Sequence, residues 1–548
     1  MRRSLIRMVW ALGFFLLCIL GPPPKCVASE PVKIWVRFSD KGPGSLGQNK
    51  STFPGMAREN ENLPVSNVYM EALKAKGFVC DTRLKWQNLV SGRIDPDSIP
   101  GLRAYAFITG ISHFPRKAKP LPTLPRFPLN WLPPGLGKSS AMGIDYGAGR
   151  ALMESLQVDK VHAWMRSAKM KPGKGMRVAV IDADFHLGSP IFSELFTQNR
   201  IRDQWDFVSN QAISVQQDLD SGSHGGECLS LIGGNLPGTL VGVAPEAEFL
   251  LYRAEENLHE GWVEEDYVAA AIERAVDSGA QVISISLGYR YEYDDGHADL
   301  PFSALDGKTR PSSIAAQGAA RRNVLVSVAM GNLPSPDHIP TSPSISAPAD
   351  ADSILAVGIA DKMRQRCSYS CTGPTADGRV KPDLVSMGAV GGCAVSVANT
   401  SMKVASLEQL QGTSFAAPVV AGIATILRQT HPELKAETIR QALISTSDSY
   451  ETPDSLVGHG LLNAWAAFLK INGDTLPHAS PVGWVRLYHG GGRIPLFIPR
   501  NSKDPLPKLE LVELSGRRIP VTVQILGPTL SIEPEHDLRT GVYMVRIQ

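Results

Sequence analysis

Gly412-Thr413-Ser414-Phe415-Ala416-Ala417-Pro418 leads into an apolar helix that we expect from Phe415 to about residue 429. The N–H groups in the first turn of a helix have no partner within it, and the helix dipole makes this end positive. A hydroxyl at Ser414 would therefore lie where N–H groups can receive the oxyanion formed when it attacks a carbonyl. Pro418 fits because a first-turn N–H is dispensable. Most serines at this position only cap a helix, so the role of Ser414 depends on other segments.

Two upstream segments supply the other groups that a serine nucleophile needs. Arg177-Val178-Ala179-Val180-Ile181-Asp182 is an apolar run that ends in a carboxylate, as expected at the carboxyl edge of a buried parallel strand. His224-Gly225-Gly226 precedes a second apolar run, and its glycines allow close backbone approach. Histidine can take the serine proton, and a carboxylate on its other nitrogen fixes the tautomer. The order Asp182, His224, Ser414 is one in which this triad recurs, whereas the absence of G-x-S-x-G argues against an α/β-hydrolase.

The residues between these motifs alternate between helical and strand patterns. Residues 264–278 carry apolar side chains on one helical face, and Gly279 suits the end of that helix. A strand is expected over residues 281–287, a helix near 312–322 and another strand over 324–329. Such alternation with short connections predicts an α/β domain, in which helices cover both faces of a parallel sheet.

Four motifs in this order resemble those of subtilisin-like serine peptidases, the subtilase family. They are Val178-Ala179-Val180-Ile181-Asp182, His224-Gly225, Ala329-Met330-Gly331-Asn332 and Gly412 to Pro418. The resemblance implies that Asp182 orients His224, that His224 is the general base and later the acid, and that Ser414 is the nucleophile. It also implies that the Asn332 side-chain amide joins the Ser414 backbone N–H in an oxyanion hole. By itself, Asn332 would be read as a turn residue.

The same resemblance assigns a substrate-binding region. Ser286, Leu287 and Gly288 match a strand to which an extended peptide adds by backbone hydrogen bonds; without the resemblance they read as part of a core strand. Ala329, Met330 and Gly331 are assigned to the pocket wall, where Met330 is bulkier than the family's usual alanine and would narrow or reshape it.

Two further positions depart from the family pattern. Asp184 stands where a glycine is usual, and its carboxylate either raises the pKa of its neighbour or lies exposed. Gly226 replaces a usual threonine, which we expect to loosen local order slightly. Neither change removes a catalytic group.

The N-terminus predicts export. Residues 1–29 have early arginines, an apolar run that ends at Leu20 and small residues near Ala28, which is the pattern of a signal peptide. The run is too short for a comfortable membrane span, and no other stretch approaches that length. We therefore expect a secreted or cell-surface protein without a transmembrane segment. Lys plus Arg number 55 against 53 Asp plus Glu, which gives no indication of a nucleic-acid partner.

Cysteine spacing does not favour a metal site. The cysteines after the predicted signal are Cys80, Cys228, Cys367, Cys371 and Cys393, an odd number that leaves at least one thiol unpaired in an oxidising compartment. We expect a bridge among the last three, with the pair left open. The Cys-x-x-x-Cys spacing lacks the further ligands of a zinc site, so no cofactor is expected. Structural calcium is common in the resembled family, but no oxygen-rich loop identifies a site for it here.

The length after residue 29 exceeds one hydrophobic core. Residues 30–115 read as a small α+β domain, with strands at 32–38 and 105–111 and a helix at 65–77. They resemble the propeptide-like region of bacterial subtilases, which implies an intramolecular inhibitor of the enzyme until it is cut; the alternative is an ordinary domain that stays attached. Residues 116–143 form a proline-rich linker suited to processing.

Two units follow the linker. Residues 144–470, which begin with a helix expected over 150–167, form the peptidase domain to which the resemblance applies. Residues 474–548 alternate like the strands of an antiparallel β-sandwich. Their segments Leu514 to Arg518 and Thr540 to Ile547 resemble C-terminal sorting domains of type 9 secretion, which implies contact with secretion machinery. The alternative is an accessory sandwich for carbohydrate or surface contacts.

Taken together, these features predict a secreted serine endopeptidase that cleaves proteins or peptides through an acyl-enzyme. One alternative is a catalytically silent subtilase fold that serves as a binding or surface scaffold. Another is an acyltransferase or peptide ligase with the same triad. For the peptidase, we expect activity to fall as pH drops through a histidine pKa of about 6–7.

Overall fold

The computed structural model describes residues 31–43, 62–113 and 144–472, together with the strands between residues 483 and 547. The range 144–472 has gaps at 214–222, 257–260, 292, 294–297, 334–342, 362–364, 388–393 and 399–406. The predicted signal peptide and linker lie outside the described residues. Within them, no helix combines the length and apolar character needed to cross a membrane.

A seven-stranded parallel sheet forms the centre of the catalytic unit, in the order β13-β12-β11-β10-β5-β9-β6. Its strands are β5 (Arg177–Asp182), β6 (Ile201–Asp206), β9 (Glu248–Arg253), β10 (Val282–Ile285), β11 (Leu325–Ala329), β12 (Leu355–Ala360) and β13 (Leu384–Met387). The inner strands are buried on both faces, which explains their continuous runs of Val, Ile, Leu and Ala. The predicted α/β fold is confirmed.

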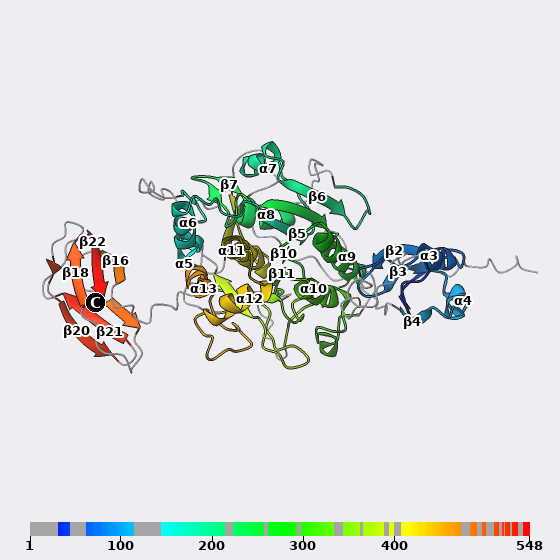
Figure 1. Ribbon diagram of the computed structural model, residues 1–548. Coiled ribbons are helices and arrows are strands. Elements are labelled where there is room, and N and C mark those ends of the chain that lie inside the picture. Colours follow the sequence, from blue (N-terminus) through cyan, green and yellow to red (C-terminus); the bar gives the residue numbers. More distant parts are fainter. Residues whose placement is uncertain are drawn as a thin grey trace, which may run out of the picture.

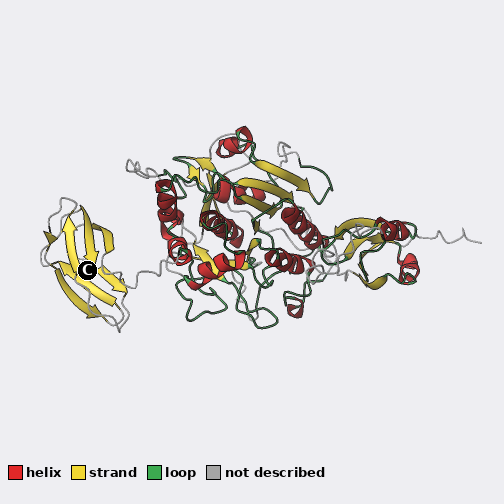
Figure 2. Ribbon diagram, in the orientation of Figure 1, coloured by secondary structure: helices red, strands yellow, loops and turns green. Residues whose placement is uncertain are grey.

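Helices cover both faces of this sheet (Figures 1 and 2). Helices α8 (His224–Gly233) and α11 (Ala416–Thr430) pack in one hydrophobic core, whereas α9 (Val263–Asp277) and α10 (Pro311–Arg321) pack in the other. Strand β5 contributes Val178 and Val180 to the first core and Ala179 and Ile181 to the second, because successive side chains of a strand point to opposite faces.

The helix expected over residues 150–167 is two helices, α5 (Arg150–Ser155) and α6 (Val158–Ser167). Gln157 between them has a φ of 57°, in the left-handed region, which ends α5 and redirects the chain. The remaining α-helices and strands described in this unit are α7 (Ser193–Thr197), α12 (Ala436–Ser445), α13 (Ala464–Ile471) and the strand pairs β7 (Asn235–Leu236) with β8 (Leu240–Val241) and β14 (Ala394–Ala398) with β15 (Leu407–Gln411).

The N-terminal unit is a four-stranded antiparallel sheet in the order β2-β3-β1-β4. Its elements are β1 (Val32–Phe38), α3 (Asn67–Lys74), β2 (Val79–Leu84), β3 (Leu89–Ile94), α4 (Ile99–Arg103) and β4 (Ile108–His113). Ile34 and Val36 of β1 pack with Leu73 of α3 on one face, whereas Trp35 packs on the other face against the core of the catalytic unit.

The strands after residue 482 form two antiparallel sheets, β16-β22-β18-β19 and β17-β21-β20. Their bounds are Gly483–His489 (β16), Leu496–Pro499 (β17), Leu509–Glu513 (β18), Arg518–Ile519 (β19), Val521–Leu526 (β20), Thr529–Pro534 (β21) and Gly541–Ile547 (β22). Strands β18, β20, β21 and β22 overlap the four runs that alternate in the sequence. The sequence reasoning missed β16, β17 and the short β19.

Candidate active site

Asp182 is the last residue of β5, near the middle of the sheet, and its side chain is fully buried. Its Oδ1 atom accepts a hydrogen bond from the backbone N–H of Ala183 at 2.8 Å. An apolar strand therefore delivers a carboxylate to the carboxyl edge of the sheet, the position that the sequence pattern predicted.

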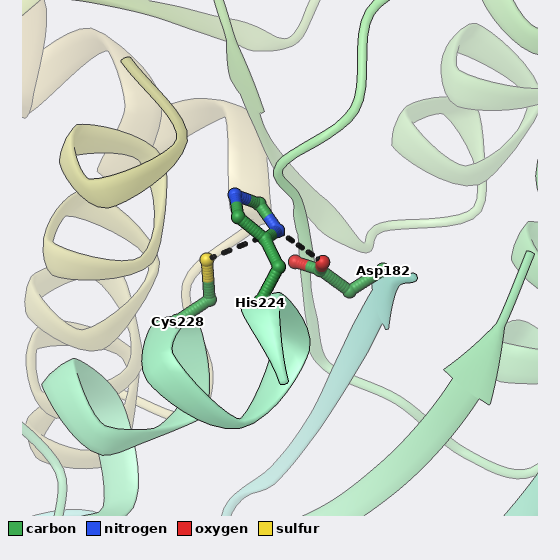
Figure 3. A group of neighbouring side chains, drawn as sticks. All are labelled: Asp182, His224 and Cys228. Atoms are coloured by element: carbon green, nitrogen blue, oxygen red, sulfur yellow. Dashed lines mark hydrogen bonds and ion pairs between the residues drawn. The ribbon is translucent and has the colours of Figure 1, made fainter. Parts of the chain in front are cut away.

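His224 is the first residue of α8 and meets Asp182 directly (Figure 3). Its Nδ1 lies 2.5 Å from Asp182 Oδ1, whereas its Nε2 points away from Asp182. The Ser223 hydroxyl caps the helix by accepting from the Gly226 N–H, which fixes the start of α8. An imidazole held this way carries its proton on Nδ1 and offers Nε2 as a base.

The surroundings of His224 favour its charged form. Burial lowers the pKa of the imidazole, but the attraction of the Asp182 carboxylate and its hydrogen bond outweigh burial, so the pKa lies well above 6.5. The side chain still has 28% of its surface exposed, so it can reach a ligand.

Ser414 lies in the short 3-10 turn η4 (Thr413–Phe415) that leads into α11. Its hydroxyl donates to the backbone carbonyl of Ser286 at 3.2 Å, and the Ser286 hydroxyl donates to the Ser414 carbonyl at 2.8 Å. In the described structure, Ser414 Oγ makes no hydrogen bond to His224. Rotation of the hydroxyl away from Ser286 is needed for the base to act on it, and such bonds are often loose without substrate.

These residues line one cavity of about 320 Å³. The lining residues are Ala183, His224, Glu255, Ser286, Leu287, Gly288, Ala329, Gly331, Asn332, Thr413 and Ser414. The structure thus brings together His224, Ser414, Asn332 and the three residues predicted as a substrate-binding strand, with Asp182 behind the imidazole. These residues come from segments more than two hundred positions apart.

Asn332 is exposed and follows β11 by three residues. Its Oδ1 accepts from the backbone N–H and the hydroxyl of Thr413, at 3.0 and 3.1 Å. This anchors the carbonyl side of the amide to the turn that carries Ser414 and leaves Nδ2 as a donor on the cavity wall. A donor at this position can stabilise an oxyanion beside Ser414.

Met330 differs from its neighbours. Ala329 and Gly331 line the cavity, whereas Met330 is fully buried, packs in the core with α9 and α10, and does not reach the lining. A Cβ atom added to Gly288 or Gly331 would lie 2.5 Å from the Ser346 hydroxyl oxygen. Gly331 also has a φ of 101°, which favours glycine, whereas a side chain at Gly288 would require the Ser346 hydroxyl to move.

Asp184 is buried and ion-paired. Arg253 Nε lies 2.8 Å from Asp184 Oδ1, and Arg253 Nη1 also lies 3.0 Å from Asp206 Oδ2. Burial raises the pKa of Asp184, and Arg253 lowers it in part. This carboxylate is therefore buried and paired with Arg253, whereas the imidazole of His224 contacts Asp182.

Sequence reasoning missed the position of Cys228, one turn after His224 on α8 (Figure 3). Its Sγ lies 4.0 Å from His224 Nδ1 and 3.4 Å from the Ser414 carbonyl oxygen. Burial raises the pKa of this thiol to about 12. Asp182, His224 and Cys228 are the group of three among the described residues whose ligand atoms, all within 4.8 Å, could hold a metal ion. The spacing of four residues on a helix was the available signal.

The other described cysteines bear on the bridge expected among Cys367, Cys371 and Cys393. Cys367 is disulfide-bonded, whereas Cys371 is a buried free thiol and so takes no part in that bridge. Cys80 is also free. Cys393 lies outside the described residues.

A sequence model of the subtilase family matches residues 173–460, which is more than half of the chain. The chain belongs to the subtilase family. This subtilase is 30% identical over 295 residues to Subtilisin BL from Lederbergia lenta, covering 54% of the chain and 91% of the relative. It is 25% identical over 328 residues to Serine protease AprX from Bacillus subtilis, covering 55% of this chain and 67% of that relative.

A solved structure supports the same fold. Fervidolysin from Fervidobacterium pennivorans, described as a keratinolytic enzyme related to subtilisin, matches with a TM-score of 0.52 and 18% identity. The match covers 95% of this chain and 70% of that one. With the family established by sequence, this subtilase is a subtilisin-like serine endopeptidase, a hydrolase that acts on peptide substrates.

Proposed function

We propose that this subtilase is an exported endopeptidase that cleaves proteins through a triad of Asp182, His224 and Ser414. The observation that supports it most strongly is the 2.5 Å contact of His224 Nδ1 with Asp182 Oδ1 beside a cavity that Ser414 also lines. A fixed imidazole next to a hydroxyl at the start of a helix is the arrangement that acyl transfer requires.

The reaction follows from this geometry. His224 Nε2 takes the Ser414 proton as Oγ attacks the substrate carbonyl, and Asp182 stabilises the imidazolium. The Asn332 Nδ2 group and the Ser414 backbone N–H receive the oxyanion. His224 then gives its proton to the leaving amine, which leaves an acyl-enzyme. Water hydrolyses the acyl-enzyme by the same steps in reverse. The substrate peptide would lie extended along residues 286–288, bound by its backbone.

A covalent probe tests the assignment. A fluorophosphonate should modify Ser414 in the intact enzyme, with the adduct located by peptide mass spectrometry. Ser414→Ala should abolish both labelling and casein hydrolysis while leaving the thermal unfolding curve unchanged. Ser193→Ala, at an exposed serine of α7, should change neither. If Ser414→Ala still hydrolysed casein, the proposed triad would be refuted and another catalytic mechanism would be required.

The same enzyme can be distinguished from a ligase or acyltransferase. If water is the natural acceptor, a peptide ester should give mainly the free acid when a millimolar amino-acid amide is present. An amide product that dominates at millimolar acceptor would instead assign acyl transfer to an amine.

We also propose that residues 30–115 act as an intramolecular inhibitor and that residues 474–548 take part in export. Backbone and side-chain hydrogen bonds from Trp35, Lys85, Trp86 and Gln87 to α9 and α10 support the first proposal. The antiparallel strands after residue 482 support the second only as a separate β-rich unit. Deleting residues 474–548 should then leave the enzyme inside the producing cell, as an immunoblot of cells and medium would measure.

A further inference from the structure

Glu255 brings a carboxylate to the wall of the active-site cavity. It lies two residues beyond the end of β9, and the last pair in the β5–β9 register joins Asp182 to Arg253. The register therefore sets Glu255 at the same edge of the sheet as the Asp182 carboxylate. Glu255 is half-buried and lines the cavity together with Ala183 and His224.

The cations and donors around Glu255 are already used by other groups. Arg253 pairs with Asp184 and Asp206, and the neighbouring buried Glu264 accepts from the backbone N–H groups of Glu256 and Gly261. Within the part of the chain that the structure describes, Glu255 has one hydrogen bond, from the Tyr289 hydroxyl at 3.3 Å, and no ion pair. None of the described residues lining the cavity is Lys or Arg.

The charge of Glu255 is sensitive to its surroundings. Burial is the main cause that raises the pKa of Glu255, to about 7. The His224 imidazolium and the Tyr289 hydrogen bond lower this pKa, whereas the Asp182 and Asp184 carboxylates raise it. Glu264, on α9, is a further carboxylate facing this group. At neutral pH the Glu255 carboxyl group is therefore partly ionised, and a cation bound beside it would favour the ionised form.

The order of the strands indicates which substrate residue meets Glu255. The predicted substrate-binding residues follow β10, which lies between β11 and β5 in the sheet. Ala329 ends β11 and Gly331 follows it on one side, whereas Ala183 and Glu255 follow β5 and β9 on the other. Successive side chains of an extended peptide point to opposite sides. If the residue whose carbonyl is attacked points toward Gly331, the residue before it points toward His224 and Glu255.

We propose that Glu255 is a specificity-determining residue that selects Lys or Arg at the position immediately before the residue whose carbonyl is attacked. The proposal rests on the proposed function of the cavity and adds its substrate class. A lysine ammonium or arginine guanidinium would reach the Glu255 carboxylate, whereas an acidic side chain would be repelled by it.

Paired peptides that differ only in charge at this position test the proposal. The full-length enzyme is assayed on a fluorogenic peptide with Lys and on its norleucine counterpart, which keeps the aliphatic stem but lacks the ammonium. We expect kcat/KM for the lysine peptide to be higher by about 10- to 100-fold. In Glu255→Gln, which keeps the size and the acceptor for Tyr289, this ratio should fall toward one. Glu255→Lys should reverse it in favour of a glutamate peptide.

The matched control is Glu256→Gln, because this neighbouring carboxylate is exposed and does not line the cavity; its ratio should equal that of the unmodified enzyme. Equal loss of kcat/KM for both peptides in Glu255→Gln would assign a structural role and overturn the proposal. An unmodified enzyme that is labelled at Ser414 and cleaves both peptides equally would overturn it while leaving the peptidase assignment intact. An enzyme that neither labels nor cleaves would overturn both.

Discussion

The oxygen and the nitrogen of the Asn332 side-chain amide have different roles. Its Oδ1 holds Thr413 by two hydrogen bonds, so Nδ2 is oriented without help from a substrate. A donor fixed in advance costs no reorganisation when charge develops, which is why such groups act mainly on the transition state. This separates its effect on turnover from its effect on binding.

Asn332→Ala should therefore lower kcat by about 100- to 1000-fold with little change in KM. Thr413→Val is the control, because it removes the hydroxyl bond to Asn332 but keeps the Thr413 N–H bond and the Nδ2 donor; it should cost far less. Steady-state kinetics on one peptide substrate measures both. A rise in KM at constant kcat would instead make Asn332 a ground-state binding group.

The pH dependence of activity follows from the Asp182–His224 pair. A general base must be neutral, so activity falls as pH drops through the pKa of His224. Burial lowers the pKa of His224, but Asp182 raises it by a larger amount. The midpoint of the acid limb in kcat/KM should therefore lie above 6.5. The sequence alone predicted about 6–7, because neither burial nor the short contact can be read from it.

Replacing the carboxylate tests this sign. In Asp182→Asn the imidazolium loses its negative partner, so the remaining activity should rise at a lower pH than in the unmodified enzyme, with kcat reduced by about 10⁴-fold. Rates measured from pH 5 to 9 at several substrate concentrations give both quantities. A midpoint that does not move, or moves upward, would show that Asp182 does not govern the protonation of His224.

Single residues also mark the limit of prediction from the sequence. Asp182, His224, Ser414 and Asn332 could be proposed because each belongs to a motif with recognisable neighbours. Glu255 could not, because Ala254-Glu255-Glu256 resembles any charged loop, and only the register of β9 on β5 brings it to the cavity. The environment of Asp184 could not be predicted either, because its ion pair with Arg253 forms only in the tertiary structure.

At the scale of elements, α8 lies unusually close to the end of β5. A Cβ atom on Gly225 would lie 2.6 Å from the Asp184 carbonyl oxygen and 2.9 Å from Asp182 Cβ. Gly225→Ala should therefore push the start of α8 away from Asp182, destabilise the fold by about 1–3 kcal/mol and lower kcat. Calorimetry and kinetics measure the two effects.

Gly101→Ala provides the matched control, because its nearest neighbour outside its own helix would be Lys76 Cδ at 3.6 Å, an ordinary contact. It should leave kcat unchanged. If Gly225→Ala changed neither the melting temperature nor kcat, α8 could move away from the end of β5 without weakening the Asp182–His224 contact.

The same scale shows why some elements could be predicted and others not. Strand β5 and helix α9 were found to within a residue or two, since burial on both faces or on one stripe leaves a clear apolar pattern. The break at Gln157 left no such signal, because a left-handed residue other than glycine is imposed by tertiary packing. Strand β6 lies at the sheet edge, and its polar sequence, Ile-Arg-Asp-Gln-Trp-Asp, does not resemble a buried strand.

At the scale of the whole molecule, the N-terminal unit docks on α9 and α10 through buried carboxylates. Asp266 accepts from the Trp35 indole N–H at 2.9 and 3.0 Å, and Glu273 accepts from the backbone N–H groups of Lys85 and Trp86 at 2.9 and 3.0 Å. The Arg322 guanidinium lies 4.1 Å from the centre of the Trp86 ring. The β2–β3 turn is thus held by acceptors on α9, a helix of the catalytic unit.

Burial raises the pKa of Asp266 to about 6 and that of Glu273 to about 7. The pKa of Asp266 is lowered by Lys33, Ser91 and Trp35 and raised by Glu265. The pKa of Glu273 is lowered by hydrogen bonds from the Trp86 and Lys85 N–H groups and by the charges of Lys85 and Lys41. A carboxyl group whose pKa is raised in the docked state binds protons more tightly there. Docking should therefore be strongest at low pH and should weaken as pH rises through 6 to 7.

This can be measured with the Ser414→Ala enzyme carrying an engineered protease site in the linker, so that the cut N-terminal unit can dissociate. We expect the dissociation constant to rise by about tenfold or more between pH 5 and pH 8. Glu273→Gln cannot titrate, so it should flatten this dependence; it keeps an oxygen for only one of the two N–H groups, so docking should also be weaker at every pH. Asp277→Asn, which removes only the more exposed partner of Lys85, should leave it unchanged. Tighter docking at pH 8 than at pH 5 would exclude these carboxylates as the groups that govern release, because their raised pKa values permit only the opposite sign.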